Sequence, residues 1–218
     1  MAANFAHQSN IFDPERARKI TVFGAGSVGS HVVFQLAKLG VSNIEVWDDD
    51  IIASHNTPMS LYGPQDVQRL KVNALSELIE RLTGVTITTK EARFSEKEHG
   101  KLRDTAVVSC VDTMSARESI WGATKHAQTV PIFCDTRTNG PYIEVFSLFP
   151  GDRKKAREYE ETLFPDDEAV PQYCGLHGIV YASSRAACIV AANVASAWSE
   201  GEYPWQIRER CDLVKQIF

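Results

Sequence analysis

The chain has 218 residues, of which 44% are hydrophobic and 23% are charged, which is typical of a globular protein and excludes a disordered or collagen-like chain. The 23 Lys and Arg against 28 Asp and Glu give a net charge of -5, so we expect no nucleic acid as a partner. No run approaches the roughly 18 apolar residues of a membrane span, and the N-terminus lacks a signal-peptide core. We therefore expect a cytoplasmic protein without a membrane partner.

The front of the chain predicts a strand, a glycine turn, a helix and a second strand. Residues 19–23 form a β-branched and aromatic run that stops at Gly24, which is typical of a buried strand. Apolar residues then recur every three or four positions from Ser27 to Leu39, which predicts one face of a helix. Residues 44–47 resume as a strand, so a βαβ unit is expected here.

The rest of the chain continues this alternation. Apolar periodicity predicts helices over 67–82, 115–127 and 178–198, with Ser115 as the cap of the second. Short β-branched runs predict strands over 85–89, 105–110, 130–135 and 142–148. The expected fold is α/β, a doubly wound, Rossmann-like mixed sheet that is mostly parallel with an antiparallel edge.

Two segments carry no clear periodicity. Residues 151–173 are highly charged and are expected to be a mobile crossover loop, either a surface excursion with a helical turn or a loop that closes over a site. The tail, 203–218, is compatible with a helix, a strand or a piece exchanged with a second subunit. No repeat or linker is visible, so residues 1–218 are predicted to form one nucleotide-binding domain.

A glycine motif lies directly after the first predicted strand and opens the first predicted helix: Gly24-Ala25-Gly26-Ser27-Val28-Gly29. Glycines allow a tight turn and close approach of phosphate oxygens to backbone N–H groups, and the helix end carries about half a positive charge. The alternative is a glycine-packed turn without a ligand. Asp48, at the end of the second predicted strand, can accept hydrogen bonds from ribose hydroxyls, which fits ATP and a dinucleotide equally well.

Asp112 and Lys71 favour a triphosphate with Mg²⁺. Asp112 follows the predicted strand 105–110, so its carboxylate should emerge at the nucleotide crevice, where a cation would have to separate it from the phosphates. Lys71 could neutralise the same phosphates. Taken singly, Asp112 could instead cap the following helix, and Lys71 could be a solvated helix residue.

These residues together follow the order and spacing of a known group. The glycine motif, Asp48-Asp49-Asp50, His55-Asn56, Lys71, and Asp112 with Arg117 five residues later resemble the ubiquitin-activating superfamily, particularly its ThiF/MoeB-like branch. The resemblance covers about residues 7–198. Ile11-Phe12-Asp13-Pro14 and His55-Asn56 look most like the short ThiF-like proteins of phage and bacterial clusters.

The resemblance implies ATP-dependent adenylation of the C-terminal Gly-Gly carboxylate of a ubiquitin-like or sulfur-carrier protein. By similarity, Gly24, Gly26, Ser27 and Gly29 hold the ATP phosphates. Asp48 would hold the ribose with Asp50 in the same nucleotide site, Asn56 and Lys71 would lie on the phosphate side, and Asp112 would bind Mg²⁺, so Lys71 and Asp112 are the expected catalytic residues. A homodimer is implied in the same way.

Three departures from the family pattern motivate alternatives. Met59 stands where the family has an arginine, His7 stands where many members have another, and the CxxC pairs that bind zinc in many relatives are missing. Arg16, Arg18 or Arg69 could compensate. The alternatives are a nucleotide-binding scaffold or regulator that has lost turnover and, third, an NAD-dependent oxidoreductase, for which no Tyr-x-x-x-Lys is present.

Cys174 is the remaining candidate, because family members that form thioesters place a cysteine near the site. It lies between the charged segment and the last predicted helix, close to His177. A nucleophile or half of a metal site is one interpretation, and a packing cysteine at a helix start is the other.

Overall fold

A computed structural model describes residues 4–95, 102–168 and 178–212. The strands are β1 Lys19–Phe23, β2 Ile44–Trp47, β3 Thr88–Lys90, β4 Thr105–Ser109, β5 Phe133–Asn139, β6 Tyr142–Leu148 and β7 Gln206–Arg210. The α-helices are α1 Ser27–Lys38, α2 Lys71–Thr83, α3 Met114–Thr124, α4 Arg153–Glu160 and α5 Val180–Trp198. Short 3-10 helices cover Pro14–Arg16, Ser54–Met59, Pro64–Asp66 and Asp166–Glu168.

All seven strands form one sheet in the order β3-β2-β1-β4-β5-β6-β7. Strands β1 to β5 run parallel to one another, whereas β6 pairs antiparallel with β5 and β7 pairs antiparallel with β6 at one edge. This confirms the predicted α/β class, a mostly parallel Rossmann-like sheet with an antiparallel edge. The chain turns to opposite sides of β1 on its way to β2 and β4, which makes the carboxyl ends of β1 and β4 the topological switch point.

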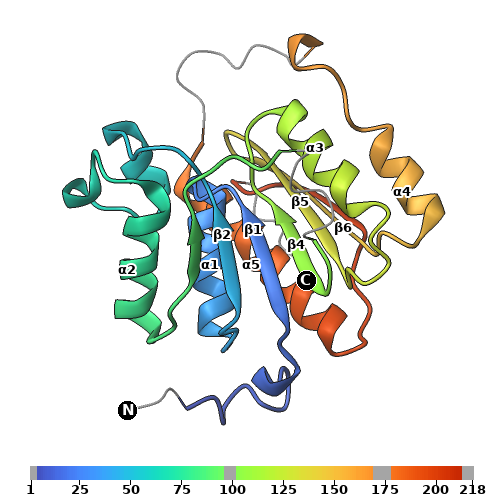
Figure 1. Ribbon diagram of the computed structural model, residues 1–218, viewed down its shortest axis with the longest axis horizontal. Coiled ribbons are helices and arrows are strands. Elements are labelled where there is room, and N and C mark those ends of the chain that lie inside the picture. Colours follow the sequence, from blue (N-terminus) through green and yellow to red (C-terminus); the bar gives the residue numbers. More distant parts are fainter. Residues whose placement is uncertain (1–3, 96–101, 169–177, 213–218) are drawn as a thin grey trace.

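The helices cover both faces of the sheet (Figure 1). Helices α1, α2 and α5 pack into the larger apolar cluster on one face, and α3 and α4 pack on the other. The second cluster is rich in aromatic side chains, with Trp121 of α3 and Tyr159 of α4 against Phe133 and Phe146 of the sheet. Burial on both faces explains why the parallel strands are continuously apolar in sequence.

Several predicted boundaries differ from the structure, and the largest shift is in β5, which spans Phe133–Asn139 where a strand over 130–135 was predicted. Helix α2 begins at Lys71 instead of Val67, because Gln68 has a φ of 72° and interrupts helical geometry. Helix α3 begins at Met114, and Thr113 caps it in place of Ser115: the Thr113 side chain accepts from the Ala116 amide. The strand expected over 85–89 is confined to Thr88–Lys90.

The described parts of the two segments without clear periodicity, residues 151–168 and 203–212, contain a helix and a strand. Within the crossover segment predicted over 151–173, of which the structure describes 151–168, the alternative of a helical turn is confirmed: α4 forms because Asp152 caps it and Tyr159 is fully buried. In the tail, β7 adds a strand to the sheet edge. None of the helices in the described ranges is long and apolar enough to cross a membrane.

Candidate functional site

The glycine motif lies at the switch point, between the carboxyl ends of three strands. Beyond β1, the Gly24 amide donates to the Trp47 carbonyl of β2 at 2.8 Å. The Cys110 amide, just after β4, donates to the Phe23 carbonyl at 2.7 Å. These bonds extend the sheet by one step, so that the glycine turn, the end of β2 and the end of β4 meet at one edge.

The three glycines of the motif have different physical roles. Gly24 has a φ of +90°, and a Cβ there would lie 2.5 Å from the Cys110 carbonyl oxygen. A Cβ on Gly29 would lie 1.8 Å from the Gly24 carbonyl oxygen, so α1 can pack on the turn only without a side chain. A Cβ on Gly26 would meet no atom within 4 Å. The chain itself requires the outer two glycines, whereas Gly26 leaves the backbone open to approach from outside.

The N-terminus of α1 faces this open space. Its N-cap is Gly26, and no side chain makes a capping hydrogen bond there. The first amides of a helix have no partner within the helix, and the helix dipole adds partial positive charge at this end. An uncapped helix start beside an unobstructed turn fits the phosphates of a nucleotide.

Asp48 lies beside the turn, with 8% of its side chain exposed. Its Oδ2 accepts from the Ala25 amide at 2.7 Å, and its Oδ1 accepts from the Asp50 amide at 2.8 Å. Burial raises the pKa of the Asp48 carboxyl, and the charge of Lys71 and these two amides oppose that rise. Asp48 thus stabilises the glycine turn. Because each carboxylate oxygen can accept a second hydrogen bond, Asp48 can still accept hydrogen bonds from ribose hydroxyls.

Lys71 is the first residue of α2 and is largely buried. Its Nζ lies 2.6 Å from Asp50 Oδ2 and 3.8 Å from Asp48 Oδ1. Tyr62, also buried, donates its hydroxyl to the Ala25 carbonyl at 2.6 Å and lies 3.2 Å from the Lys71 carbonyl. The structure therefore brings Lys71 to the same edge as the glycine turn and Asp48.

Arg93 adds a second cation at this edge. Its Nε donates to Asp49 Oδ1 at 3.0 Å, and its Nη2 lies 3.7 Å from Asp50 Oδ1. Its pKa is raised, first by the hydrogen bond that it donates to Asp49 and, as the smallest contribution, by the charge of Asp112. Asp48, Asp49 and Asp50 have carboxylate oxygens within 4.8 Å of one another, and Lys71 and Arg93 offset two of these three negative charges.

Asp112 is exposed three residues after β4 ends, at the same edge as Asp49 and Arg93. Thr113, not Asp112, caps α3, which removes the alternative in which Asp112 serves as the helix cap. Within the described residues, Asp112 has neither a hydrogen-bond partner nor an ion-pair partner. Its oxygens are therefore available to a hard cation such as Mg²⁺, which prefers carboxylate ligands.

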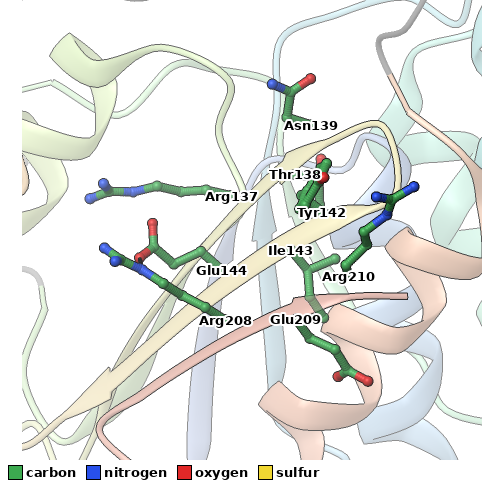
Figure 2. Close-up of a pocket in the computed structure, with 9 residues that line it drawn as sticks. All are labelled: Arg137, Thr138, Asn139, Tyr142, Ile143, Glu144, Arg208, Glu209 and Arg210. Carbon is green, nitrogen blue, oxygen red and sulfur yellow. Dashed lines mark hydrogen bonds and ion pairs between the residues drawn. The ribbon is translucent and has the colours of Figure 1, made fainter. Parts of the chain in front are cut away.

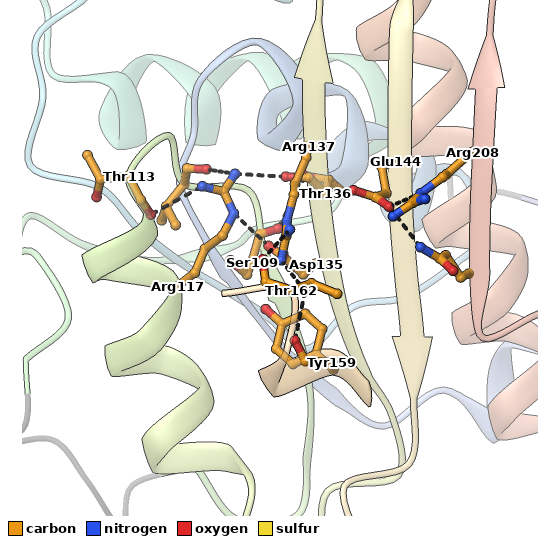
Figure 3. Close-up of polar contacts among 12 residues, drawn as sticks. Ser109, Thr113, Arg117, Asp135, Thr136, Arg137, Glu144, Tyr159, Thr162 and Arg208 are labelled. Atoms are coloured by element: carbon orange, nitrogen blue, oxygen red, sulfur yellow. Dashed lines mark hydrogen bonds and ion pairs between the residues drawn. The ribbon is translucent and has the colours of Figure 1, made fainter. Parts of the chain in front are cut away.

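Arg117 holds the chain on both sides of Asp112 (Figure 3). Its Nη1 donates to the Thr113 carbonyl at 3.1 Å, and its Nη2 donates to the Val111 carbonyl. Its Nε donates to Asp135 Oδ1 at 3.1 Å, and both side chains are buried. The arginine predicted from the Asp112 spacing is thus a buried support of the Asp112 loop.

Asn56 and Met59 lie in the 3-10 helix Ser54–Met59. Asn56 Oδ1 accepts from the Ala53 amide at 2.9 Å, so this oxygen stabilises the turn. The Met59 sulfur would lie 2.9 Å from a Cβ on Gly178, which places it against the start of α5. Met59 is thus an apolar packing residue at this position.

The three arginines expected to compensate for Met59 do not fill that place. Arg69 is engaged by Asp66 at 3.2 Å and by Glu77 at 2.5 Å. Arg16 and Arg18 precede β1 and therefore lie at the amino end of the sheet, opposite the glycine turn (Figure 1).

A groove of about 460 Å³ lies over the antiparallel edge, on strands β5, β6 and β7 (Figure 2). Three arginines line it, Arg137, Arg208 and Arg210, together with the exposed ring of Tyr142. Glu144 accepts from Arg208 and from Gln206 in the same area. Glu144 and Glu209 also line the groove, so its arginines are largely balanced by acidic side chains.

The cysteines give little support for a nucleophile. Cys174 and His177 lie outside the described residues. Burial raises the pKa of the Cys110 and Cys134 thiols to about 12, so neither forms a thiolate at neutral pH.

Sequence reasoning missed four residues that shape this site: Tyr62, Arg93, Asp135 and Arg137. Asp135 and Arg137 stand in or next to a predicted buried strand, and charged residues are seldom buried without a partner. That signal could have identified them as a pair. Tyr62 and Arg93 lie in irregular segments, where no local pattern indicates their contacts.

A model of the ThiF family matches residues 9–202. Over 107 residues, 48% of this chain, it is 32% identical to the NEDD8-activating enzyme E1 catalytic subunit of Dictyostelium discoideum and 33% identical to that of Arabidopsis thaliana. The chain covers 24% of each of these relatives.

Solved structures show the same fold. The E. coli MccB structure with ATP superposes with a TM-score of 0.70 at 15% identity, over 93% of this chain and 64% of MccB. PaaA superposes with a TM-score of 0.68 at 19% identity, over 91% of this chain and 72% of PaaA. Because the family match extends over most of a chain whose glycine turn, Asp48 and Asp112 share one edge of the sheet, this protein belongs to the ThiF family.

Proposed function

We propose that this protein uses ATP and Mg²⁺ to adenylate the C-terminal carboxylate of a peptide or small carrier protein. The observation that carries the proposal is that one edge of the sheet holds both the uncapped α1 N-terminus at Gly26 and the carboxylate of Asp112, which has no hydrogen-bond or ion-pair partner among the described residues. Glycine amides donate hydrogen bonds to phosphate oxygens, and a carboxylate needs a cation before it can lie near those phosphates. An NAD site gives Asp112 no comparable task.

The reaction requires little acid–base catalysis. The substrate carboxylate is ionised at pH 7 and attacks the α-phosphorus of ATP; the bond to the bridging oxygen breaks, and pyrophosphate leaves with the electron pair. Alignment of the two reactants contributes roughly 7–11 kcal/mol in such reactions. Mg²⁺ held by Asp112 would neutralise charge on the phosphates. Lys71 and Asn56 would lie on the phosphate side, with Asp48 and Asp50 on the ribose side.

The partner's C-terminal segment would reach the site along the groove over β5, β6 and β7. The groove lies on the same sheet as the glycine turn, and its arginines are paired with Asp135, Glu144 and Asp212, so a terminal carboxylate would exchange with one of these partners. A small C-terminal pair such as Gly-Gly would let the carboxylate enter a narrow crevice. The relative MccB, crystallised with the peptide MccA, illustrates a peptide substrate on this fold.

ATP–pyrophosphate exchange tests the proposal. Purified protein with Mg²⁺ and a candidate carrier ending in Gly-Gly should incorporate labelled pyrophosphate into ATP. Asp112→Ala should abolish exchange, whereas Glu118→Ala, which removes an exposed carboxylate of the following helix α3, should leave it unchanged. Exchange that persists in Asp112→Ala, with Mg²⁺ still required, would reject the metal role of Asp112.

A nucleotide-binding scaffold or regulator is the second candidate, because Met59 packs against α5 where the family pattern has an arginine. It predicts ATP binding in calorimetry without exchange in the presence of any carrier. Binding of NAD in place of ATP would favour the oxidoreductase.

The whole chain would act as one domain and as a homodimer in which His7, at the amino end of the sheet, approaches a neighbouring subunit.

A further inference from the structure

The N-terminus of α3, two residues after Asp112, has a partner for each of its first four amides. The Ala116 amide donates to the Thr113 hydroxyl at 3.3 Å, and the Arg117 amide donates to the Thr113 carbonyl at 3.3 Å. The Met114 amide donates to Asp166 Oδ1 at 2.6 Å, and the Ser115 amide faces Asp166 Oδ2 at 3.4 Å. Asp166 is 52 residues from Met114 in sequence. The helix is therefore capped in part by a distant segment.

That segment, residues 161–168 after α4, is called the crossover segment here. A second set of contacts links Thr162 of the crossover segment to the loop that contains Asp112 (Figure 3). Arg137 donates from Nη1 to the Thr162 carbonyl at 3.0 Å and from Nη2 to its hydroxyl at 2.9 Å. Asp135 then accepts from both Arg137 at 3.0 Å and Arg117 at 3.1 Å. Arg117 in turn holds the carbonyls before and after Asp112.

We propose that Asp166 is a positioning residue, which fixes the start of α3 and thereby the orientation of Asp112 at the phosphate edge. This inference rests on the proposed function for the role of Asp112, but the contacts themselves do not depend on it. Asp166 accepts hydrogen bonds from the start of α3, directly after the Asp112 loop. Thr162 is linked to the same loop through Arg137, Asp135 and Arg117. Any displacement of the crossover segment is therefore transmitted to the carboxylate that would hold Mg²⁺.

Charge makes Asp166 suited to this role. A negative side chain is stabilised at a helix N-terminus, and charge-assisted bonds to backbone amides are among the stronger hydrogen bonds. The pKa of Asp166 is lowered, first by a hydrogen bond from the Ser115 side chain and then by the Met114 amide. Its neighbour Asp167 is similarly exposed and makes no such contact among the described residues, which provides a matched control.

Hydrogen exchange by mass spectrometry tests the anchoring without any substrate. In full-length protein, Asp166→Ala should accelerate exchange in peptides covering residues 111–117 by about fivefold, the effect typical of losing a capping side chain. Asp167→Ala should leave exchange there unchanged. Asp166→Asn, which keeps one oxygen acceptor, should lie between wild type and Asp166→Ala. Unchanged exchange in Asp166→Ala would overturn the proposal.

Mg²⁺ dependence of ATP binding tests the consequence. In calorimetry, Asp166→Ala should raise the Mg²⁺ concentration that half-saturates the ATP-bound protein several-fold, while affinity for ATP in EDTA stays within twofold of wild type. In the Asp112→Ala background, Asp166→Ala should add no further change, because the residue through which it acts is missing.

The outcomes separate the two proposals. If wild-type protein binds ATP with no Mg²⁺ dependence, the proposed function fails, and the hydrogen-exchange result still decides whether Asp166 anchors the Asp112 loop. If exchange accelerates but the half-saturating Mg²⁺ concentration is unchanged, Asp166 is a structural cap only and the positioning role is rejected.

Discussion

Two helix N-termini meet the same edge of the sheet, and they are built in opposite ways. Helix α1 starts after β1 at Gly26 without a side-chain cap, and the space beside that glycine is open. Helix α3 starts after β4 with Thr113 and Asp166 satisfying its first amides. The same position in a doubly wound fold thus yields an anion site in one case and a supporting element in the other.

Local capping chemistry decides between these outcomes. The N-terminus of each helix carries about half a positive charge, which attracts the nearest anion. At α3 the chain supplies that anion as Asp166. At α1 it supplies none within the described residues, so a phosphate can fill the position. The closed helix supports the loop that would bring Mg²⁺ to the phosphates at the open one.

The largest expected effect on the free energy of unfolding comes from the buried residues that support the capped start of α3. Asp135 is fully buried between Arg117 and Arg137, so Asp135→Ala leaves two buried guanidinium groups without their carboxylate. We expect a loss of about 3–5 kcal/mol in the free energy of unfolding, measured by urea denaturation.

A matched control is Glu144→Ala, which removes a carboxylate paired with the exposed Arg208 on the same sheet. It should cost less than about 1 kcal/mol, as is usual for surface ion pairs. Equal losses in the two variants would show that burial of the Asp135 network contributes nothing specific.

The glycine turn gives the next largest effect and separates stability from binding. Gly24→Ala places a Cβ 2.5 Å from the Cys110 carbonyl at a φ of +90°, and we expect about 3 kcal/mol of destabilisation. Gly26→Ala meets no atom within 4 Å, so its unfolding free energy should stay within about 1 kcal/mol of wild type. Its ATP affinity should fall by at least about tenfold, because the methyl group occupies the phosphate approach.

Calorimetry and urea denaturation on the same preparations check both variants. Wild-type ATP affinity in a stable Gly26→Ala protein would show that the nucleotide does not approach the backbone at this turn.

Local sequence patterns predicted the uncapped start of α1 well and the capped start of α3 poorly. Strands β1, β2 and β6 begin and end where the sequence predicts, because apolar runs bounded by glycine or charged residues are strong signals. The glycine motif is contiguous and is read directly. Helix α2 was placed too early because Val67 and Leu70 continue the apolar period, although Gln68 breaks the helix geometry.

The closed end depends on contacts between distant residues. Arg117 bonds Asp135 at a separation of 18 residues, and Asp166 reaches Met114 across 52. No spacing rule connects these positions, and Asp166 looks like any other member of an acidic surface run. Sequence spacing suggested Arg117, but its buried position beneath the Asp112 loop required the three-dimensional structure.

A smaller effect on stability is expected from substitutions at the starts of the two helices, α3 and α1. Thr113→Ala removes the hydroxyl that accepts from the Ala116 amide and should cost about 1 kcal/mol in the free energy of unfolding. Ser27→Ala, at the first position of α1, should change stability by less than about 0.5 kcal/mol, since α1 has no side-chain cap to lose. Thermal and urea denaturation measure both. A larger loss for Ser27→Ala would mean that α1 is capped in solution.

The smallest effect concerns the thiol beneath the glycine turn. A Cys110 pKa of about 12 leaves only about one thiol in ten thousand ionised at pH 8, and Cys134 is alike, whereas Cys188 is exposed. Iodoacetamide at pH 8 should therefore alkylate Cys188 while sparing Cys110 and Cys134, as peptide mass mapping would show. Because Cys110 packs against Gly24, Gly24→Ala should accelerate labelling of Cys110, whereas Gly26→Ala should not. Equal labelling in both variants would indicate that the turn and the end of β4 move independently.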